Sequence, residues 1–334
     1  MGTPRFAFLV HPLTAGHRRV LGLRIGAPGL LFGQRDGADP FDVRRVARLG
    51  IPGIVEGVVI STALTPDELL ADQERALTRL LRAAALARAD GPLAAIGLGA
   101  LNAVVAGRGT ALAERVPEPV TTGGAATAWA LVENTLAVCA ARQTAGPVAI
   151  IGSRSPVGAA VAALLVEAGL AVRVDHPKAG RGLAVEPCAG PADAAAGAPV
   201  VVGAGPTGGT LDPAALAPGA VVVDVAIPAT LTGPPPAGVQ VLAGEAVVPP
   251  IGFGGDRWRL LYQVLAGYGP GQVYACLVEP LVLAVEGRAR PYALGRAVEP
   301  AAVREFGRAA ERLGFRPRLA RGWRGVPPGA LGGR

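Results

Sequence analysis

One cysteine stands in a segment whose residue pattern gives its thiol a chemical use. Cys276 lies in the run 272–280, which reads Q-V-Y-A-C-L-V-E-P. A thiolate is a strong nucleophile, and the N-terminus of a helix favours this ionised form. A helix that runs through Pro280 loses the hydrogen bond to the carbonyl of Cys276, whereas a helix that begins at Pro280 places Cys276 just before its N-terminus. A cysteine in an apolar helix is otherwise a small core residue, and this structural interpretation stays open.

Four other residues have polar groups that could serve such a nucleophile. His11 follows an apolar run, and its imidazole, which titrates near neutral pH, could orient a carbonyl or move a proton. It could equally bond a neighbouring backbone group. Glu279 would share the helical face of Cys276, either for proton transfer or as a structural carboxylate. Thr122 and Gly123 precede a helical stretch and could donate to a carbonyl or a nicotinamide, or only cap that helix.

A glycine turn between an apolar run and a helical stretch is typical of a dinucleotide site. Gly152 directly follows the run 148–151 and suits the tight turn, while Gly158 lets the helix pack close to the sheet. The N–H groups at such a helix start can hold a phosphate. The usual middle glycine is absent, and a domain that keeps this fold without a ligand is the alternative. The residues expected at the dinucleotide are Gly152, Ser153, Arg154, Ser155, Val157 and Gly158, with Ala226 after a later apolar run.

Charged residues near the expected ribose pocket favour two different cofactors. Asp175 ends the strand after the glycine turn, where a carboxylate accepts a hydrogen bond from a ribose hydroxyl and repels a 2′-phosphate, as in NAD-binding proteins. Basic groups lie near it and could hold that phosphate, as in NADP-binding proteins. These groups are Arg154, His176, Lys178 and Arg181. The charges alone leave the choice between NADH and NADPH open.

The elements that position these residues follow from the hydrophobic pattern. Beyond Gly146-Pro147, short Val/Ile runs alternate with helical stretches, which is typical of a parallel sheet covered on both faces. The predicted strands here are 147–151, 171–175, 199–203, 220–225 and 239–242, with a helix over 157–168. In the N-terminal half, strands are predicted over 6–10, 54–60 and 93–100 and helices over 65–89 and 125–143, and in the C-terminal part helices over 257–265 and 273–286. Thr65 and Glu68 form a capping box at the first helix start.

This pattern predicts an α/β fold with four segments. Residues 1–145 form an N-terminal α/β substrate domain, and residues 146–255 form a Rossmann-type domain that binds NAD(P). Residues 256–317 form a C-terminal helical segment that carries the cysteine and packs back on the cleft between the two domains. Residues 318–334, rich in Arg, Pro and Gly, form a flexible tail.

Composition excludes several classes of protein. The net charge is +7, but aromatic residues are only 4% of the 334 residues, too few for a nucleic-acid stacking surface. Three cysteines give neither a disulfide framework nor the spacing of a metal site. The sequence shows no secretory signal pattern and no apolar run long enough to span a membrane. We therefore expect a cytoplasmic protein with reduced thiols.

The segment around the cysteine resembles a known family. Residues 272–287 (Q-V-Y-A-C-L-V-E-P-L-V-L-A-V-E-G) are similar to the segment that carries the acylated cysteine in long-chain acyl-acyl-carrier-protein reductases of the cyanobacterial type, which form fatty aldehydes. Further blocks resemble the same family in the same order. These blocks are 8–14, 56–70, 94–105, 121–129 and 311–317.

The resemblance implies an activity and its partners. A member of this family reduces a long-chain acyl thioester, carried by acyl carrier protein or coenzyme A, to an aldehyde through an acyl-cysteine, here on Cys276, with NADPH as the reductant. Departures from the family pattern bear on the cofactor and the substrate. They are Ser155 in place of the middle glycine, Asp175 in place of a basic residue, Asn102-Ala103 in place of serines, and Pro280 in place of a residue that favours helix.

Two other functions remain as alternatives. A shikimate-dehydrogenase-like oxidoreductase would act on a small substrate and use Cys276 only for packing. Such an enzyme is expected to have a Lys/Asp pair in its N-terminal half, and the chain has no lysine before Lys178. A nucleotide-binding scaffold without turnover would bind the cofactor and show no thiol reactivity at Cys276.

Overall fold

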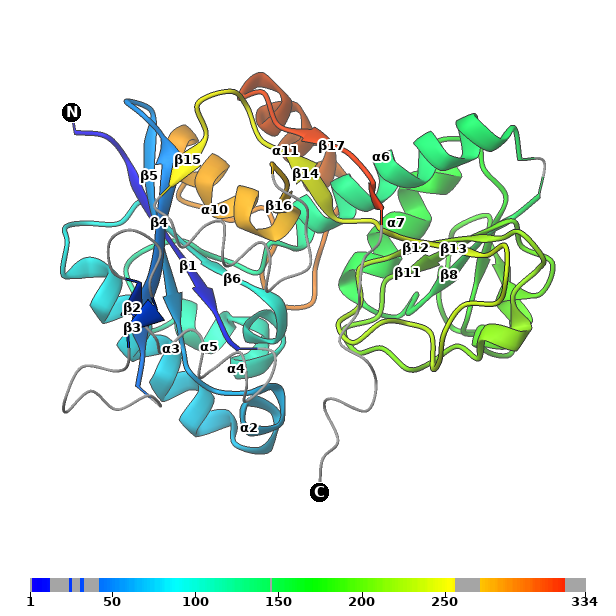
Figure 1. Cartoon of the computed structure of the whole chain (residues 1–334), viewed down its shortest axis with the longest axis horizontal. Coiled ribbons are helices and arrows are strands. Elements are labelled where there is room, and N and C mark those ends of the chain that lie inside the picture. The colour runs from blue at the N-terminus through cyan, green and yellow to red at the C-terminus, as the bar shows by residue number, and fades with distance from the viewer. Residues whose placement is uncertain are drawn as a thin grey trace. The chain divides into compact units, whose positions relative to one another are not determined.

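The computed structural model describes residues 2–12, 24–25, 31–32, 42–144, 146–255 and 271–321 (Figure 1). The chain divides into two compact units that alternate along the sequence. The first unit contains residues 1–122, 252–265 and 280–295, and the second contains residues 123–251, 266–279 and 296–334. The units are therefore not the contiguous segments of the predicted domain boundaries, because the long helix after residue 123 belongs with the second sheet.

The first unit is built on a mixed sheet in the strand order β15-β4-β5-β1-β6-β7. Strands β5, β1, β6 and β7 are parallel, and β4 and β15 extend the sheet in antiparallel pairing. The strand bounds are β1 Arg5–Val10, β4 Arg44–Ile51, β5 Val55–Ser61, β6 Ala95–Leu98, β7 Val120–Thr121 and β15 Gly254–Gly255, and a separate hairpin joins β2 Arg24–Ile25 to β3 Leu31–Phe32. The parallel core thus agrees with the predicted α/β class, whereas β4 was not predicted.

Helices of the first unit cover its sheet with small and aliphatic side chains. They are α2 Pro66–Ala71, α3 Gln73–Arg88, the 3-10 helix η1 Ala100–Ala103, α4 Val105–Arg108 and α5 Thr110–Ala113. The predicted capping box is present, because the N–H of Thr65 donates to Oε2 of Glu68 at 2.8 Å. The single helix predicted over 65–89 is wrong at Asp72, whose carboxylate accepts from the N–H of Arg75 at 2.9 Å and begins a second helix.

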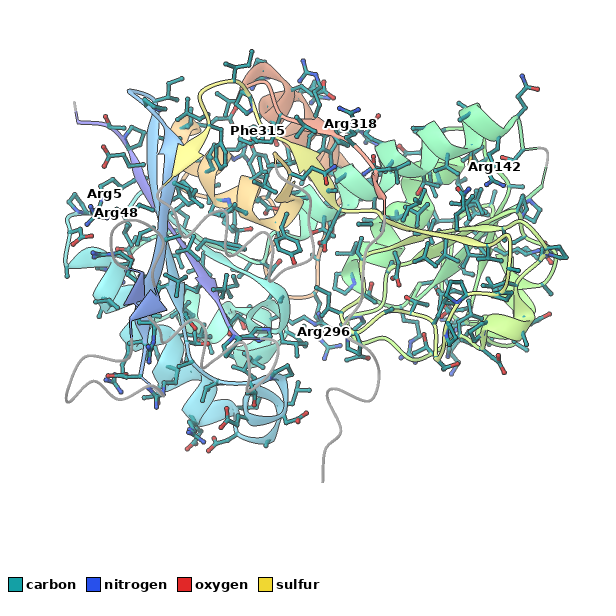
Figure 2. The ribbon with its side chains drawn as sticks, in the orientation of Figure 1. Arg5, Arg48, Arg142, Arg296, Phe315 and Arg318 are labelled. Atoms are coloured by element: carbon teal, nitrogen blue, oxygen red, sulfur yellow. The ribbon has the colours of Figure 1, made fainter. Side chains whose placement is uncertain are left out.

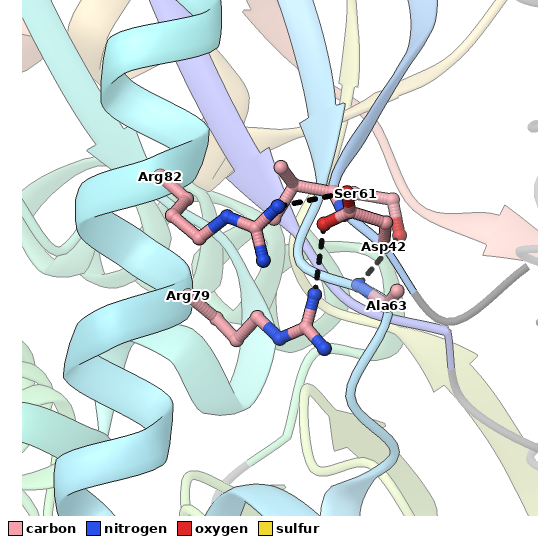
Figure 3. A network of polar contacts seen from close by, with 6 residues as sticks. Asp42, Ser61, Ala63, Arg79 and Arg82 are labelled. Carbon is pink, nitrogen blue, oxygen red and sulfur yellow. Dashed lines mark hydrogen bonds and ion pairs between the residues drawn. The ribbon is translucent and has the colours of Figure 1, made fainter. Parts of the chain in front are cut away.

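Ion pairs of arginine fix the edges of the first unit. Asp42, just before β4, accepts from Arg79 at 2.9 Å and from Arg82 at 2.8 Å, so it ties α3 to the start of that strand (Figure 3). Asp90 similarly pairs with Arg5 at 3.9 Å and Arg48 at 3.5 Å, both labelled in Figure 2. Part of the positive charge read from the sequence is therefore used within the fold.

The second unit is built on a sheet in the order β10-β9-β8-β11-β12-β13-β18. Every pair from β10 to β13 is parallel, and only β18 is antiparallel to its neighbour. The bounds are β8 Val148–Ile151, β9 Val172–Val174, β10 Glu186–Pro187, β11 Val200–Gly203, β12 Val221–Asp224, β13 Gln240–Ala243 and β18 Ala320–Arg321. Numbered from β8, the parallel strands follow the order 3-2-1-4-5-6 of a doubly wound dinucleotide-binding sheet. This confirms the predicted fold class.

Helices cover both faces of this sheet. One face packs its alanines and valines against α8 Pro191–Ala195 and η2 Pro213–Ala215. On the other face, α6 Gly124–Arg142 packs against β11 and β12, and α7 Pro156–Glu167 packs against β8 and β9. Helix α11 Pro300–Arg312 packs on α6 and α7, with Phe306 edge-on to Trp129 at 5.6 Å between ring centroids. At the other end of α6, Arg142 donates to the carbonyl of Gly219 at 2.7 Å (Figure 2).

A small antiparallel sheet, in the order β16-β14-β17, leads into the helix that carries Cys276. Its strands are β14 Ala246–Val248, β16 Val273–Tyr274 and β17 Arg316–Pro317, and α10 Ala275–Glu286 follows β16 at once. Helix α10 runs through Pro280, so the alternative in which it begins at Pro280 is wrong, and Cys276 lies in its first turn.

Two predicted C-terminal features have different outcomes. Strand β18, Ala320–Arg321, pairs with β13 although it lies in the segment predicted as a flexible tail. The rest of that tail, residues 322–334, and the helix predicted over 257–265 lie outside the described residues.

Candidate functional site

The glycine turn after β8 has no room for a side chain at its two glycines. Gly152 has a φ of +85°, and a Cβ there would lie 2.3 Å from the backbone nitrogen of Gly205. A Cβ at Gly158 would lie 2.3 Å from the carbonyl oxygen of Gly152. Positive φ is costly for any residue with a Cβ, and contacts this short are sterically forbidden. The fold therefore requires glycine at both positions, and it brings the loops after β8 and β11 into contact at the point where the strand order reverses.

Ser155 lies in the run 153–155 that replaces the middle glycine of a dinucleotide fingerprint, and it holds the turn together. Its hydroxyl accepts from the N–H of Gly158 at 2.8 Å and donates to the carbonyl of Ala204 at 2.7 Å. Helix α7 begins directly after it, with Pro156 in its first position. The N–H of Val157 is one of the first-turn donors that an α-helix cannot satisfy internally. The turn thus keeps a helix N-terminus at the carboxyl edge of the sheet.

Asp175 closes the turn from the neighbouring strand. It directly follows β9, and its carboxylate accepts from the N–H of Gly152 at 2.7 Å and from the N–H of Ser153 at 3.1 Å. The hydroxyl of Ser153 donates to the same carboxylate. His176 follows, with Nδ1 accepting from the N–H of Lys178 at 3.0 Å. The structure therefore brings Asp175 to the glycine turn, whereas Arg154 points its exposed side chain to solvent.

A buried carboxyl group, that of Asp224, lies at the end of β12 on the same edge of the sheet. Asp224 accepts from the N–H of Ala226 at 3.0 Å and from the N–H and hydroxyl of Thr230, each at 2.8 Å. Burial raises the pKa of Asp224 to about 6, against the opposing effect of these hydrogen bonds. Ala226 itself is buried. The polar groups of Asp224 and Ala226 thus shape the loop after β12.

Cys276 reaches this edge through the end of β13. The N–H of Gly244 donates to the carbonyl of Asp224 at 2.9 Å, and the carbonyl of Glu245 accepts from the N–H of Ala275 at 3.0 Å. Cys276 is the next residue, and its side chain is half-buried. Within the second unit, the thiol and the glycine turn therefore stand at the carboxyl ends of strands of one sheet.

The first turn of α10 meets the N-terminus of α6. Gly123, the residue before α6, has a φ of +72°, and a Cβ there would lie 2.5 Å from the Cβ of Cys276. Glu279 is fully buried, and its Oε2 accepts from the N–H of Ala126 in the first turn of α6 at 2.8 Å. A carboxylate at this end of a helix is favoured by the helix dipole. The geometry favours the structural interpretation of Glu279 and places the start of α6 against Cys276.

Two other residues predicted for the site, His11 and Thr122, form hydrogen bonds within the first unit. His11 is buried, with Nε2 accepting from the N–H of Leu101 at 3.1 Å and Nδ1 donating to the carbonyl of Pro12 at 3.0 Å. Burial lowers the pKa of His11 to about 4, so the imidazole is neutral. The N–H and hydroxyl of Thr122 both donate to the carbonyl of Ala293. The bonds of His11 favour its structural alternative, whereas Thr122 bonds Ala293 and does not cap α6, whose N-cap is Gly123.

The other two cysteines differ from Cys276 in their surroundings. Cys139 and Cys188 are buried, and burial raises the pKa of each thiol. Among the described residues, no group of three His, Cys, Asp or Glu side chains could hold a metal ion. No described helix has both the length and the apolar character needed to cross a membrane.

Sequence reasoning missed one residue that shapes the carboxyl edge. Asn134 is buried in α6, and its amide donates to the carbonyl of Gly244 at 2.8 Å. It therefore anchors the segment that leads from β13 towards Cys276. The available signal was a lone amide side chain within an otherwise apolar helical stretch, since buried polar groups need partners.

No family model matches the chain, and a curated relative aligns with most of it. The aminotransferase PigE from Serratia sp. is 27% identical over 343 residues, an alignment that covers 93% of this chain and 39% of PigE. The chain thus spans about two fifths of the relative that it matches. This relative is described as an aminotransferase, so the predicted family of long-chain acyl-acyl-carrier-protein reductases is wrong.

Two solved structures show weak similarity. A dehydrogenase from Rhizobium meliloti is 22% identical with a TM-score of 0.27, covering 45% of this chain and 58% of that one. An NADPH-dependent glyoxylate/hydroxypyruvate reductase from Sinorhizobium meliloti is 16% identical with a TM-score of 0.32, covering 68% and 72%. TM-scores this low do not establish a shared fold. The fold and the candidate site are therefore assigned from the geometry of this chain alone.

Proposed function

We propose that the chain is a nicotinamide-dinucleotide-dependent oxidoreductase whose second unit binds the cofactor at the carboxyl edge of its parallel sheet. The observation that carries this proposal is the contact between Gly152 and Gly205, where the loops after β8 and β11 meet at the reversal of strand order. In open α/β sheets, ligands bind at this position. Glycine at position 152 allows this close contact between the two loops beside the N-terminus of α7.

The residues present fit a dinucleotide. The N-terminus of α7 offers the N–H of Val157 and a positive dipole end to a pyrophosphate. The exposed guanidinium of Arg154 can pair with the same phosphates. Asp175 offers a carboxylate to a ribose hydroxyl. When bound, the reduced nicotinamide would supply a hydride to the substrate.

Cys276 gives the proposal its finer form, the reduction of an acyl thioester borne by a carrier protein or coenzyme A. Its thiolate would attack the thioester carbonyl carbon, a new carbon–sulfur bond would form, and the original one would break as the carrier's thiolate leaves and takes a proton from water. Hydride addition and cleavage of the bond to Cys276 would then release an aldehyde. The support is that Cys276 lies in the first turn of α10, at the same sheet edge as the glycine turn.

The start of α6 would assist this attack. Its first-turn N–H groups, which a helix cannot satisfy internally, follow Gly123, and Gly123 packs on Cys276. Such donors stabilise both a thiolate and the oxyanion of a tetrahedral intermediate. One of them, the N–H of Ala126, is already taken by Glu279, so the donors of Gly124 and Ala125 would serve the substrate.

A second candidate is an oxidoreductase that acts on a small carbonyl substrate without a covalent intermediate. The observation that favours it is the tight packing of Cys276 against Gly123, which a purely structural cysteine would also show. Both candidates use the same dinucleotide site. They differ only in whether the Cys276 thiol reacts.

Intact-mass spectrometry after incubation with a long-chain acyl thioester, without cofactor, separates the two candidates. We expect a mass gain of one acyl group in the wild type and in Cys139→Ala, the matched control, and none in Cys276→Ala. Equal labelling of Cys276→Ala, or no labelling of any protein, would leave Cys276 as packing and favour the second candidate. Binding of NADH or NADPH, followed by the fluorescence of the reduced nicotinamide, tests the proposal common to both.

A further inference from the structure

The carboxylate of Asp175 is held at the glycine turn by three donors. The N–H groups of Gly152 and Ser153 and the hydroxyl of Ser153 all donate to it. A carboxylate accepts about four hydrogen bonds in total, and three donors leave room for about one more. The carboxylate therefore keeps a fixed position, with capacity for one further O–H donor.

The position of this carboxylate is the one that meets the adenosine ribose in a doubly wound sheet. Asp175 directly follows β9, the strand beside β8, and its own N–H donates to the carbonyl of Ile150 at 3.2 Å. A ribose 2′-hydroxyl can donate to the remaining lone pair. A 2′-phosphate has at most one proton to donate near neutral pH and brings like charge against an anchored anion, which is a strong repulsion.

The basic residues nearby lack a comparable anchor. Arg154, Lys178 and Arg181 have exposed side chains, and within the described part of the chain no ion pair fixes them. His176 uses Nδ1 to accept from the main chain of its own turn. Holding a long, exposed basic side chain on a phosphate costs side-chain entropy, so exposed pairs contribute little. The fixed negative charge therefore outweighs the flexible positive ones.

We infer that this chain selects NADH over NADPH, that Asp175 is the residue that makes the selection, and that Ser153 is a positioning residue that holds its carboxylate. The inference rests on the proposed dinucleotide site and adds the identity of its cofactor. It differs from the NADPH that the family resemblance implied, because that family has a basic residue where Asp175 stands.

Equilibrium titration of the full chain with NADH and with NADPH, followed by reduced-nicotinamide fluorescence and checked by calorimetry, tests the inference. In the wild type we expect NADH to bind roughly tenfold to a hundredfold more tightly than NADPH, as like-charge discrimination predicts. Asp175→Asn keeps the shape and removes the charge, and it should bring the ratio of the two dissociation constants close to one. Circular dichroism confirms that each variant is folded.

Ser153 is tested through the same ratio rather than through affinity alone. Ser153→Ala removes one donor to Asp175 and should lower the preference for NADH several-fold, and Ser153→Thr, which keeps the hydroxyl, should restore it. A merely structural role would weaken both cofactors equally and leave the ratio unchanged. Arg154→Ala is the matched control, since it should weaken both cofactors through the shared phosphates.

The outcomes separate this inference from the proposed function. Tighter binding of NADPH by the wild type, or an unchanged ratio in Asp175→Asn, would overturn the inference and leave the dinucleotide site standing. If neither cofactor binds the wild type at millimolar concentration, the proposed function itself fails and the inference fails with it.

Discussion

The two units end their parallel strands in opposite ways. In the first unit, His11 directly follows β1 and its two ring nitrogens bond the main chain, while the amide of Asn102 donates to the carbonyl of Leu9. In the second unit, Gly152 directly follows β8, and the helix after it keeps the N–H of Val157 as a first-turn donor at the sheet edge. Polar side chains bond the main chain at both edges, but the second edge also has the N-terminus of α7, where the N–H of Val157 has no partner within the helix.

The two edges also bury ionisable groups of opposite kind. Burial lowers the pKa of His11 to about 4 and raises the pKa of Asp224 to about 6, so both groups are driven towards their neutral forms. Because one is a base and the other an acid, they change the pH dependence of stability in opposite directions.

Substitution of Gly152 by Ala should abolish dinucleotide binding, a loss of at least about a hundredfold, since the new Cβ would lie 2.3 Å from the backbone of Gly205 and φ is +85°. The matched control is Gly169→Ala, with a φ of +83° and no atom within 4 Å of the added Cβ. Nicotinamide fluorescence measures binding, and thermal unfolding reports the cost of positive φ in both variants. If the two variants bind the dinucleotide equally well, the glycine turn is not part of the binding site.

Gly123→Ala tests the approach of α6 to the thiol. A Cβ there would lie 2.5 Å from the Cβ of Cys276, so the first turn of α10 must move, and acylation by a thioester should fall by about tenfold or more. Gly271→Ala is the control, because it has a φ of +86° and open space around the added Cβ. The rate of mass gain measures the effect. Unchanged acylation in Gly123→Ala would show that α6 does not assist the thiol.

The buried His11 and Asp224 should have opposite effects on the free energy of unfolding between about pH 4 and 6. From pH 6.5 down to about 4, the unfolded chain protonates His11 and the folded chain does not, so stability falls as pH falls. Between pH 3.8 and about 6, the folded chain keeps Asp224 protonated and the unfolded chain does not, so stability falls as pH rises. Each shift corresponds to about 3 kcal/mol, and the two contributions largely cancel.

Asp224→Asn should expose the His11 contribution. Urea unfolding at a series of pH values would show the variant gaining about 3 kcal/mol relative to the wild type between pH 4 and 6.5. The difference between the two proteins cancels the other titrating groups. Parallel curves for the variant and the wild type would mean that Asp224 ionises normally in the folded chain.

The smallest effect is expected from the carboxylate that caps α6. Glu279→Gln keeps the shape of the side chain but replaces the carboxyl group that bonds the N–H of Ala126 with an amide, and it should lower the free energy of unfolding by about 1–2 kcal/mol. Chemical denaturation measures this loss. Acylation of Cys276 should persist in the variant, because Glu279 acts in capping; a complete loss of acylation would assign it to catalysis.

Local patterns in the sequence predicted most of the second sheet but not the contacts that build the site. Each predicted strand from β8 to β13 lies within about a residue of its observed position, because apolar runs and glycine breaks are local features. The break at Asp72 was missed because a capping side chain interrupts an otherwise continuous helical pattern. The approach of Gly123 to Cys276 joins segments far apart in the chain, and no spacing rule reveals it.

The residues of the glycine turn show the same limit in another form. The spacing of Gly152 and Gly158 indicated the turn, whereas the role of Ser155, which ties it to Ala204, needed the structure. The pattern of charged residues likewise did not predict the hydrogen bonds from the turn to Asp175. Because of these bonds, Asp175 has a fixed carboxylate, whereas the sequence showed only an acidic residue among basic ones. The roles of these residues in binding stay predictions.

Hydrogen exchange with and without NADH, followed by mass spectrometry of the full chain, tests the contrast between the two edges most directly. We expect NADH to slow exchange in peptides covering 152–158 and 175–178 and to leave peptides covering 99–104, beside His11, unchanged. Protection confined to the end of β1, or none in the glycine turn at saturating NADH, would contradict the assignment of the dinucleotide site to the second unit.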